Sequence, residues 1–235
     1  MDDTLKAALG ILAAVAVAVV LLALVVQTIR RERRIRADLQ AFARERGLRF
    51  DGQGRSGGDP ARFTLSGDET GLVIDIIRSQ SRKSGGTTRS IPGSTRISLP
   101  DPRFAGGLAV YSAHHDPATA AAASQLLGIF DNDLSRSLLS RVIGAEYGTH
   151  LGQLQAFDAP PGLAVTILAT ADPAQQFDTA AIAEALATIP HHRKAEPMIL
   201  LGETGLKLRL AQDITDTETL AGILDTFTAL QSRLR

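Results

Sequence analysis

The longest apolar run of the chain lies near its N-terminus, where residues 7–29 carry no charged side chain between Lys6 and Arg30. Thirteen of these residues are Leu, Ile or Val, and most of the others are Ala. At about 1.5 Å per residue, a helix of this length measures about 34 Å, enough to cross a hydrocarbon core of about 30 Å. The large aliphatic side chains together contribute on the order of −5 kcal/mol toward insertion. The pattern predicts a transmembrane helix over residues 7–29, preceded by a short N-terminus, residues 1–6.

A cleaved signal peptide would produce a similar hydropathy profile, but its apolar region is about 7–15 residues long and follows a basic segment. Here residues 1–6 have a net charge of −1, and no cleavage site with small residues follows the run. A buried helix of a soluble domain is a further alternative, although such helices are seldom apolar on every face for six turns. The sequence therefore favours an uncleaved signal-anchor.

Charged residues on the two flanks predict the orientation of this helix. The N-terminal flank carries one Lys, whereas five arginines follow the run closely: Arg30, Arg31, Arg33, Arg34 and Arg36. An excess of Lys and Arg marks the cytoplasmic side of a span. We therefore expect a single-pass protein with its N-terminus outside and its large C-terminal part in the cytoplasm. The Ala/Gly/Arg-rich composition is bacterial in style, so the expected location is the bacterial inner membrane.

Residues 30–47 are expected to continue the membrane helix as a basic juxtamembrane segment. Ile35, Leu39 and Phe42 form a narrow apolar stripe at helical spacing, and Gly47 is a suitable residue for ending the helix. One interpretation is a basic amphipathic helix lying on anionic headgroups. The other is a rigid stalk whose stripe packs on the folded domain. We favour the stalk, and the two interpretations are compatible.

Beyond residue 47 the apolar period changes from helical to two, which predicts strands. In residues 48–145 we expect the strand pairs Phe63–Ser66 with Leu72–Arg78 and Arg96–Leu99 with Leu108–Ser112, then helices at Pro117–Leu127 and Asp133–Ile143. In residues 146–235 we expect strands near Gly152–Phe157 and Leu163–Ala169, a helix near Thr179–Ile189, strands at Met198–Leu201 and Leu206–Leu210, and a helix near Thr217–Leu234. The last range contains two strand–strand–helix units.

These elements predict an α+β fold in which hairpins form an antiparallel sheet and the helices collect on one face. The two ranges could be two sub-domains, 48–145 and 146–235. Within the first, the segment 79–96 is basic, because Arg82, Lys83 and Arg89 lie in a stretch without acids. Its middle, Ser79–Ser94, is rich in Ser, Gly and Thr, which predicts a long mobile hairpin loop.

Charge is unevenly distributed along the chain although the formal net charge is zero. Residues 30–103 contain sixteen Lys or Arg against nine Asp or Glu, a net charge of +7, whereas residues 104–235 contain eight against fourteen, a net charge of −6. An anionic inner leaflet would attract the first part and repel the second. The charge distribution is therefore consistent with the expected topology.

Motifs for metal, nucleotide or nucleophilic chemistry are not evident in the sequence. The histidine pairs His114-His115 and His191-His192 are adjacent residues without ligand spacing, and His150 stands alone. There is no cysteine, no Gly-x-Ser-x-Gly and no phosphate-binding glycine motif. We therefore expect no cofactor, metal or catalytic residue of a standard type.

Most of the distal acids fall at expected helix starts, where a carboxylate can cap free N–H groups. They include Asp131, Asp133, Asp172, Asp178, Asp213 and Asp216. Asp75 differs because it lies inside an apolar strand, and we expect it to form a buried ion pair with Arg78 or Arg96.

Three functional hypotheses remain. The leading one is a membrane-anchored protein-interaction or assembly module, with a protein partner or a second copy of the chain. The second is a module that binds anionic lipid, for which the possible headgroup contacts are Arg30, Arg31, Arg33, Arg34, Arg36, Arg82, Lys83 and Arg89. The third is an enzyme with a non-standard site around His114, His115 and distal acids. Nucleic acid is not expected as a partner, because the basic segment has no aromatic residue to stack on bases.

Overall fold

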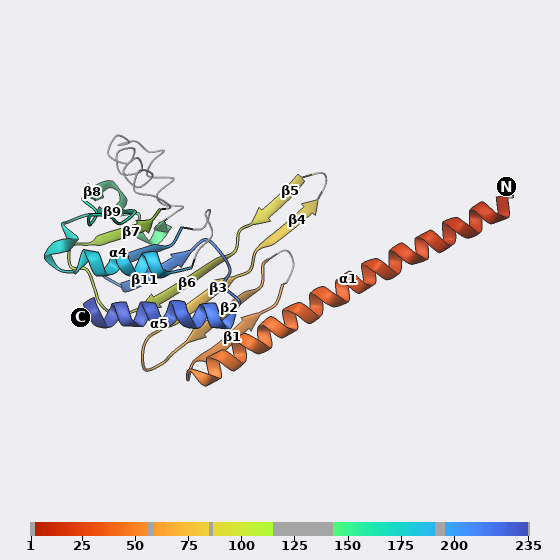
Figure 1. Cartoon of the computed structure of the whole chain (residues 1–235), viewed down its shortest axis with the longest axis horizontal. Coiled ribbons are helices and arrows are strands. Elements are labelled where there is room, and N and C mark those ends of the chain that lie inside the picture. Colours follow the sequence, from red (N-terminus) through yellow and green to blue (C-terminus); the bar gives the residue numbers. More distant parts are fainter. Residues whose placement is uncertain (1–2, 56–58, 85–86, 115–142, 191–195, 235) are drawn as a thin grey trace.

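The computed structural model has an α+β architecture, in which a long N-terminal helix leads into an antiparallel sheet covered by helices (Figure 1). It describes residues 3–55, 59–84, 87–114, 143–190 and 196–234. Within this part, the side chains of residues 3–18, 21, 82–84, 89 and 145 are not described. The predicted helix at Pro117–Leu127 lies outside the described residues, and so does the one at Asp133–Ile143 except for Ile143.

The main sheet of the described residues has nine strands in the order β1-β2-β3-β6-β11-β10-β7-β9-β8, and every neighbouring pair is antiparallel. The strands are β1 (Arg49–Gln53), β2 (Arg62–Ser66), β3 (Val73–Ile77), β6 (Ser94–Leu99), β7 (Leu108–Ala113), β8 (Gln155–Phe157), β9 (Val165–Ala169), β10 (Met198–Gly202) and β11 (Gly205–Leu210). Strand β1 was not among the expected elements, because its polar sequence Arg-Phe-Asp-Gly-Gln lacks an apolar alternation.

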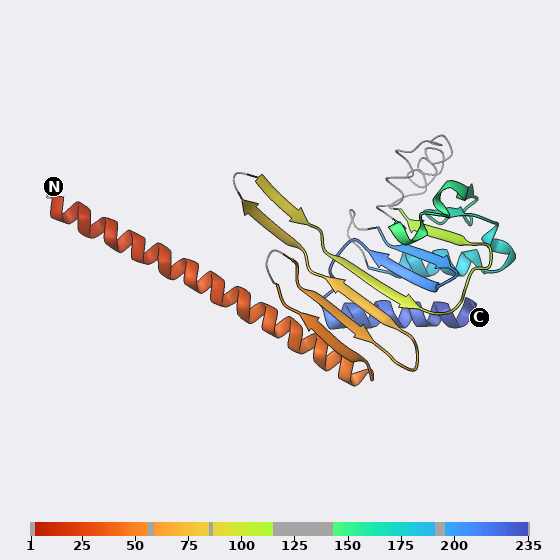
Figure 2. The same cartoon turned by 180° about the vertical axis from the view of Figure 1, so that it is seen from behind.

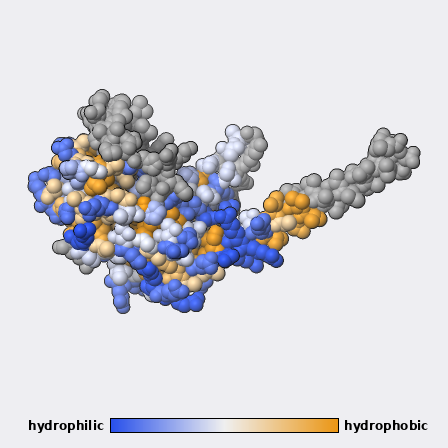
Figure 3. Space-filling view, viewed as in Figure 1, coloured by the Kyte–Doolittle hydropathy of each residue, from blue (hydrophilic) through white to orange (hydrophobic). Residues whose placement is uncertain are grey.

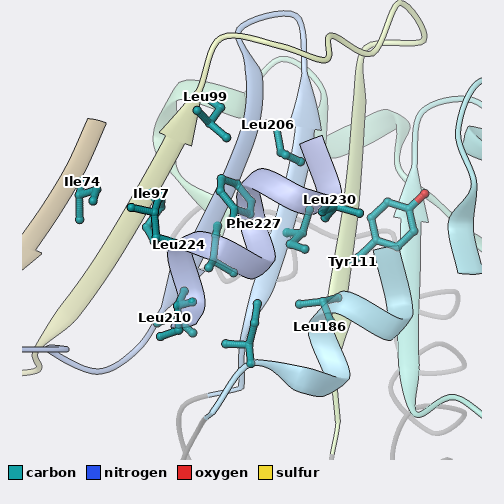
Figure 4. Packing of buried hydrophobic residues seen from close by; sticks show 14 of the residues in the cluster. Ile74, Ile97, Leu99, Tyr111, Leu186, Leu206, Leu210, Leu224, Phe227 and Leu230 are labelled. Carbon is teal, nitrogen blue, oxygen red and sulfur yellow. The ribbon is translucent and has the colours of Figure 1, made fainter. Parts of the chain in front are cut away.

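Helices α4 (Thr179–Thr188) and α5 (Thr217–Leu234) contact each other and cover the same face of the sheet (Figures 1 and 4). Three short 3-10 helices, η1 (Ala145–Tyr147), η2 (Leu151–Gln153) and η3 (Pro173–Gln175), lie in the connections. These positions confirm the two strand–strand–helix units, β8-β9-α4 and β10-β11-α5. The prediction that the helices collect on one face holds for α4 and α5, whereas η1 and η2 pack Tyr147 and Leu151 with Leu200 in a second core on the opposite face.

The main core lies between the sheet and these two helices. Alternate residues of the central strands, such as Ile97, Leu206 and Leu208, are fully buried under the helices. Figure 4 shows Leu224, Phe227 and Leu230 of α5 extending toward these strands. Because the side chains of a strand alternate between faces, the period-two pattern in the sequence selects this face for burial.

One predicted strand pairing is wrong. The strands expected at Arg96–Leu99 and Leu108–Ser112 exist as β6 and β7, but they are not neighbours. The hairpin β10–β11 lies between them, with β11 paired to β6 and β10 paired to β7. The local period of apolar residues indicates that a segment forms a strand, but it does not indicate which other strand pairs with that segment. As a result, the ranges 48–145 and 146–235 contribute strands to one sheet.

The expected loop at Ser79–Ser94 is also different in the structure. It forms a two-stranded antiparallel hairpin of β4 (Gln80–Ser84) and β5 (Thr87–Ile91), which extends beyond the main sheet (Figure 1). The loop prediction relied on the scarcity of apolar residues. Strand pairing, however, is made by backbone hydrogen bonds, which a Ser/Thr-rich sequence can form as well.

Helix α1 (Asp3–Glu45) is continuous, which confirms that the juxtamembrane segment extends the N-terminal helix. The stripe packs on the domain as expected for a stalk, because Leu39 and Phe42 are buried and Ile35 is packed against the core. The helix ends at Glu45 and is followed by Gly47, whose φ is 65°. There the N–H of Leu48 donates to the Ala43 carbonyl at 2.7 Å, an arrangement typical of a glycine-terminated helix.

A polar clamp holds the same end of α1 against α5. The guanidinium of Arg46 donates to the carboxylate of Asp225 at 2.6 Å and lies over the Phe42 ring, 5.3 Å from its centroid. This hydrogen bond lowers the pKa of Asp225 below its ordinary value. Both groups are close to solvent, so the clamp orients the helix more than it stabilises the fold.

No helix in the described part of the chain is both long enough and apolar enough to cross a membrane. The structure thus confirms a helix over residues 7–29 and does not confirm the predicted span.

Truncating Leu39 tests the attachment of α1 to the domain. Leu39→Ala should lower the free energy of unfolding by about 2–5 kcal/mol, because it leaves a cavity where a fully buried side chain contacts the core. The matched change Leu24→Ala, on the exposed part of the same helix, should alter it by less than about 0.5 kcal/mol. The measurement is denaturant unfolding of the full chain. Equal effects of the two substitutions would show that α1 does not pack on the sheet.

Candidate membrane interface

The part of α1 that extends away from the sheet exposes large apolar side chains. We call residues 19–29 the apolar segment. Its described exposed members are Val19, Val20, Leu22, Leu24, Val25, Val26 and Ile29, with exposed fractions from 40% to 65%. In Figure 3 this segment is visible as a hydrophobic surface next to the strongly hydrophilic base of the helix. Contiguous exposed apolar surface of this kind marks a site that another apolar phase or molecule covers.

The exposed apolar residues surround the helix axis instead of forming a stripe. Successive residues of an α-helix are about 100° apart, so these positions leave no sector wider than about 100° without a large apolar side chain. A partner helix in water would need a one-sided stripe at heptad or helical spacing. The described apolar side chains of this segment therefore do not form the one-sided stripe that a single partner helix in water would contact.

The five arginines that follow the apolar segment are all exposed on α1. Arg34 lies 4.0 Å from Asp38 one turn further on, a weak surface contact. Arg30, Arg31, Arg33 and Arg36 form no ion pair with any described residue. The structure thus places a ring of five arginines directly beside an exposed apolar surface, and four of them have no ion-pair partner among the described residues.

A groove of about 220 Å³ lies where this ring meets the sheet. Its apolar side includes Ile29, Ile35 and Phe63. Its charged side consists of Arg33, Arg36, Arg78 and Glu32, whose carboxylate lies 3.0 Å from Arg55. Arg78 is already paired, since its Nη1 lies 2.9 Å from the Asp213 carboxylate. The cations available to a ligand in this groove are therefore Arg33 and Arg36.

The basic hairpin β4–β5 extends from the sheet on the side toward which the N-terminal part of α1 projects, as the two opposite views agree (Figures 1 and 2). Arg82 of β4 lies directly opposite Arg89 of β5, and Lys83 lies opposite Thr88. The side chains of Arg82, Lys83 and Arg89 are outside the described part. The fold therefore places the backbone of the hairpin on the side toward which α1 projects. It does not show whether the basic side chains of the hairpin lie next to the arginines of α1.

His114, the described member of the histidine pairs, has a partner at each ring nitrogen. Its Nδ1 lies 3.1 Å from the Glu196 carboxylate and its Nε2 lies 2.8 Å from the Thr166 hydroxyl. These contacts connect the end of β7 to β9 and to the segment before β10. His115, His191 and His192 lie outside the described residues, within which no group of three or more His, Cys, Asp or Glu could hold a metal ion.

Asp75 forms an ion pair, but with a different arginine from those expected. Its carboxylate accepts a hydrogen bond from the Thr64 hydroxyl at 2.7 Å and lies 3.1 Å from Arg62, whereas Arg78 pairs with Asp213. Asp75 lies on the face opposite α4 and α5 and is only half-buried. The sequence could not indicate this partner, because Arg62 is adjacent only through the β2–β3 register.

The predicted capping role of the distal acids is confirmed at three positions. Asp172 accepts from the N–H of Ala174, Asp178 from those of Ala180 and Ala181, and Asp216 from that of Thr219. Hydrogen bonds from the Thr219 hydroxyl and N–H lower the pKa of Asp216. Asp213 instead pairs with Arg78, and Asp131 and Asp133 lie outside the described residues.

Comparison of this chain with models of protein families, with curated proteins and with solved structures finds no match.

Proposed function

We propose that this protein is a single-pass membrane-anchored α+β domain that acts as a protein-interaction or assembly module. In this proposal, residues 7–29 span the inner membrane, residues 1–6 are outside, and the domain is in the cytoplasm. The observation that carries the proposal is the apolar segment of α1, whose large side chains are exposed on all sides of a helix that projects from the domain.

Insertion into lipid would remove this apolar surface from water, a transfer that is favourable in proportion to its area. The helix also satisfies its own backbone hydrogen bonds, as a segment in lipid must. The adjacent arginines would lie among the headgroups on one side, where each Lys or Arg near an anionic surface contributes about 1 kcal/mol. Their position after the segment supports a cytoplasmic domain through the positive-inside rule.

The charge distribution supports a role for the distal part in binding a partner. The basic range 30–103 includes the base of α1 and the hairpin, while the acidic range 104–235 includes α4 and α5. An anionic leaflet would hold the first toward the lipid and leave acidic positions such as Glu184 and Glu203 available to proteins. Either a second copy of the chain or another protein could be the partner.

A second function, binding of anionic lipid, is favoured by the groove beside α1. Arg33 and Arg36, which form no ion pair with any described residue, lie beside apolar residues, and the one acid in the lining, Glu32, is paired with Arg55. This combination suits a phosphate headgroup attached to an acyl chain. This function is compatible with anchoring, since the groove is lined by the residues that directly follow the apolar segment.

Two arginines placed in the apolar segment should prevent anchoring. In Val19→Arg with Leu22→Arg, the two charges cost about 5–7 kcal/mol in the middle of a span and cancel the favourable transfer of the aliphatic residues. The variant should be released from membranes by alkaline carbonate, whereas the wild type stays bound. The control Ala37→Arg with Gln40→Arg adds the same charge at exposed positions beyond the segment and should stay bound. Membrane retention of the first variant would contradict the anchor.

Charge reversal on the distal acids should weaken assembly. After cross-linking in native membranes and mild solubilisation, we expect the wild type in a complex larger than one chain. Glu184→Lys with Glu203→Lys should reduce that complex, while Asp51→Lys with Asp59→Lys, an equal change at exposed positions of the basic range, should preserve it. Recovery of the wild type only as a monomer would argue against an interaction module.

A further inference from the structure

A line of side chains crosses the face of the sheet opposite α4 and α5. The strand register places Asp75 beside Arg96, Arg96 beside Arg209, and Arg209 beside Met198. Two arginines on neighbouring strands are therefore direct cross-strand partners. Like charges in this position repel each other and destabilise a sheet, so the pair requires an explanation.

A cavity of about 380 Å³ lies over this pair. Besides Arg96 and Arg209, its lining includes Pro92, Ser94, Glu196 and Met198. The side chain of Arg209 is half-buried and donates to the carbonyl of Ile143, which fixes its direction. Arg96 is exposed and forms no ion pair with any described residue. One guanidinium is thus held in place, and the other is free to bind.

The acids nearby have other partners. Asp75 accepts a hydrogen bond from Thr64 and pairs with Arg62, and Glu196 lies 3.1 Å from the ring of His114. Glu146 is close enough to favour the charged form of Arg209, but burial and then the charge of Arg96 outweigh it and lower the pKa of Arg209. An arginine stays protonated in proteins, so the lowered pKa means that the positive charge of Arg209 is destabilised by its surroundings. A bound anion would reduce this destabilisation.

We propose that Arg96 and Arg209 bind a phosphate group in this cavity. Two guanidinium groups can each donate two parallel hydrogen bonds to phosphate oxygens, and their charge of +2 exceeds the single negative charge of Glu196 in the same lining. Proximity of Pro92 and Ser94 shows that the cavity lies at the base of the β4–β5 hairpin. The phosphate could accordingly belong to a soluble phosphate ester or to a lipid headgroup. This inference does not depend on the membrane anchor.

Inorganic phosphate is the first probe, titrated into the full-length protein in a neutral detergent at constant ionic strength. We expect phosphate to raise the unfolding temperature of the wild type and to bind measurably by calorimetry. Arg96→Gln should weaken this binding at least about tenfold, because it removes one of two bidentate donors. Arg49→Gln removes the same charge from an exposed strand position and should bind phosphate as the wild type does.

The unfolding temperature of the Arg96→Gln variant without phosphate distinguishes a binding role of Arg96 from a structural role. Arg96→Gln removes a like-charge repulsion, so without phosphate it should unfold at the same temperature as the wild type or higher. A lower unfolding temperature together with unchanged phosphate binding would overturn the proposal. Absence of phosphate stabilisation in the wild type would also overturn it, unless the lipid probe below stabilises the protein through Arg96.

The lipid probe distinguishes the two sources. The full chain is reconstituted in phosphatidylcholine bilayers with and without phosphatidic acid. Stabilisation by phosphatidic acid in the wild type and not in Arg96→Gln would assign the cavity to a headgroup. Stabilisation by inorganic phosphate alone, again lost in Arg96→Gln, would assign it to a soluble ester. If phosphatidic acid stabilises both proteins equally and inorganic phosphate stabilises neither, the anion binds elsewhere and the proposal is wrong.

Discussion

The hairpin β10–β11 connects the two halves of the sheet, and the rest of the molecule depends on it. Leu206 and Leu208 of β11 and Ile199 of β10 are fully buried under the helices, while the backbones of the two strands pair with β6 on one side and β7 on the other. In β11 the buried leucines alternate with half-buried Lys207 and Arg209, so a one-residue slip would turn these charged side chains toward the core, and burial fixes the register of this strand. That register also places Arg209 beside Arg96.

The same burial determines where α1 begins to leave the domain. Leu39 and Phe42 complete the core at one edge of the structure, and Ile35 packs against it. Toward the N-terminus, the described apolar side chains from Val19 to Ile29 are exposed. From its C-terminal end toward its N-terminus, α1 thus carries residues buried in the protein core, then a ring of arginines, and then exposed apolar residues that we propose lie in lipid. The basic hairpin lies on the side of the proposed membrane, and the range 104–235 is acidic. This charge distribution is consistent with the proposed orientation.

Features that depend on neighbouring residues were predictable from the sequence. The bounds of α5 and the turn at Gly205 follow from helical spacing and from glycine after a short polar turn, and both are confirmed. Features that depend on distant residues were not, because periodicity carries no information about partners. Three features could be predicted only if the strand order were known: the insertion of β10–β11, the Asp75–Arg62 ion pair and the Arg96–Arg209 contact. The β4–β5 hairpin was missed for another reason, because backbone pairing of two strands does not require apolar residues.

Single-cysteine scanning of α1 tests the membrane anchor most directly, and the natural chain contains no cysteine that would interfere. Each variant is treated with a membrane-impermeant maleimide in right-side-out and inside-out membrane vesicles. A membrane-spanning α1 with a cytoplasmic domain predicts labelling at Thr4 only from the outside, protection of every position from Val19 to Ile29, and labelling at exposed positions such as Ala37 only from the inside. Labelling that recurs every three to four residues between Val19 and Ile29 would contradict it, since this period indicates a helix with one face in water.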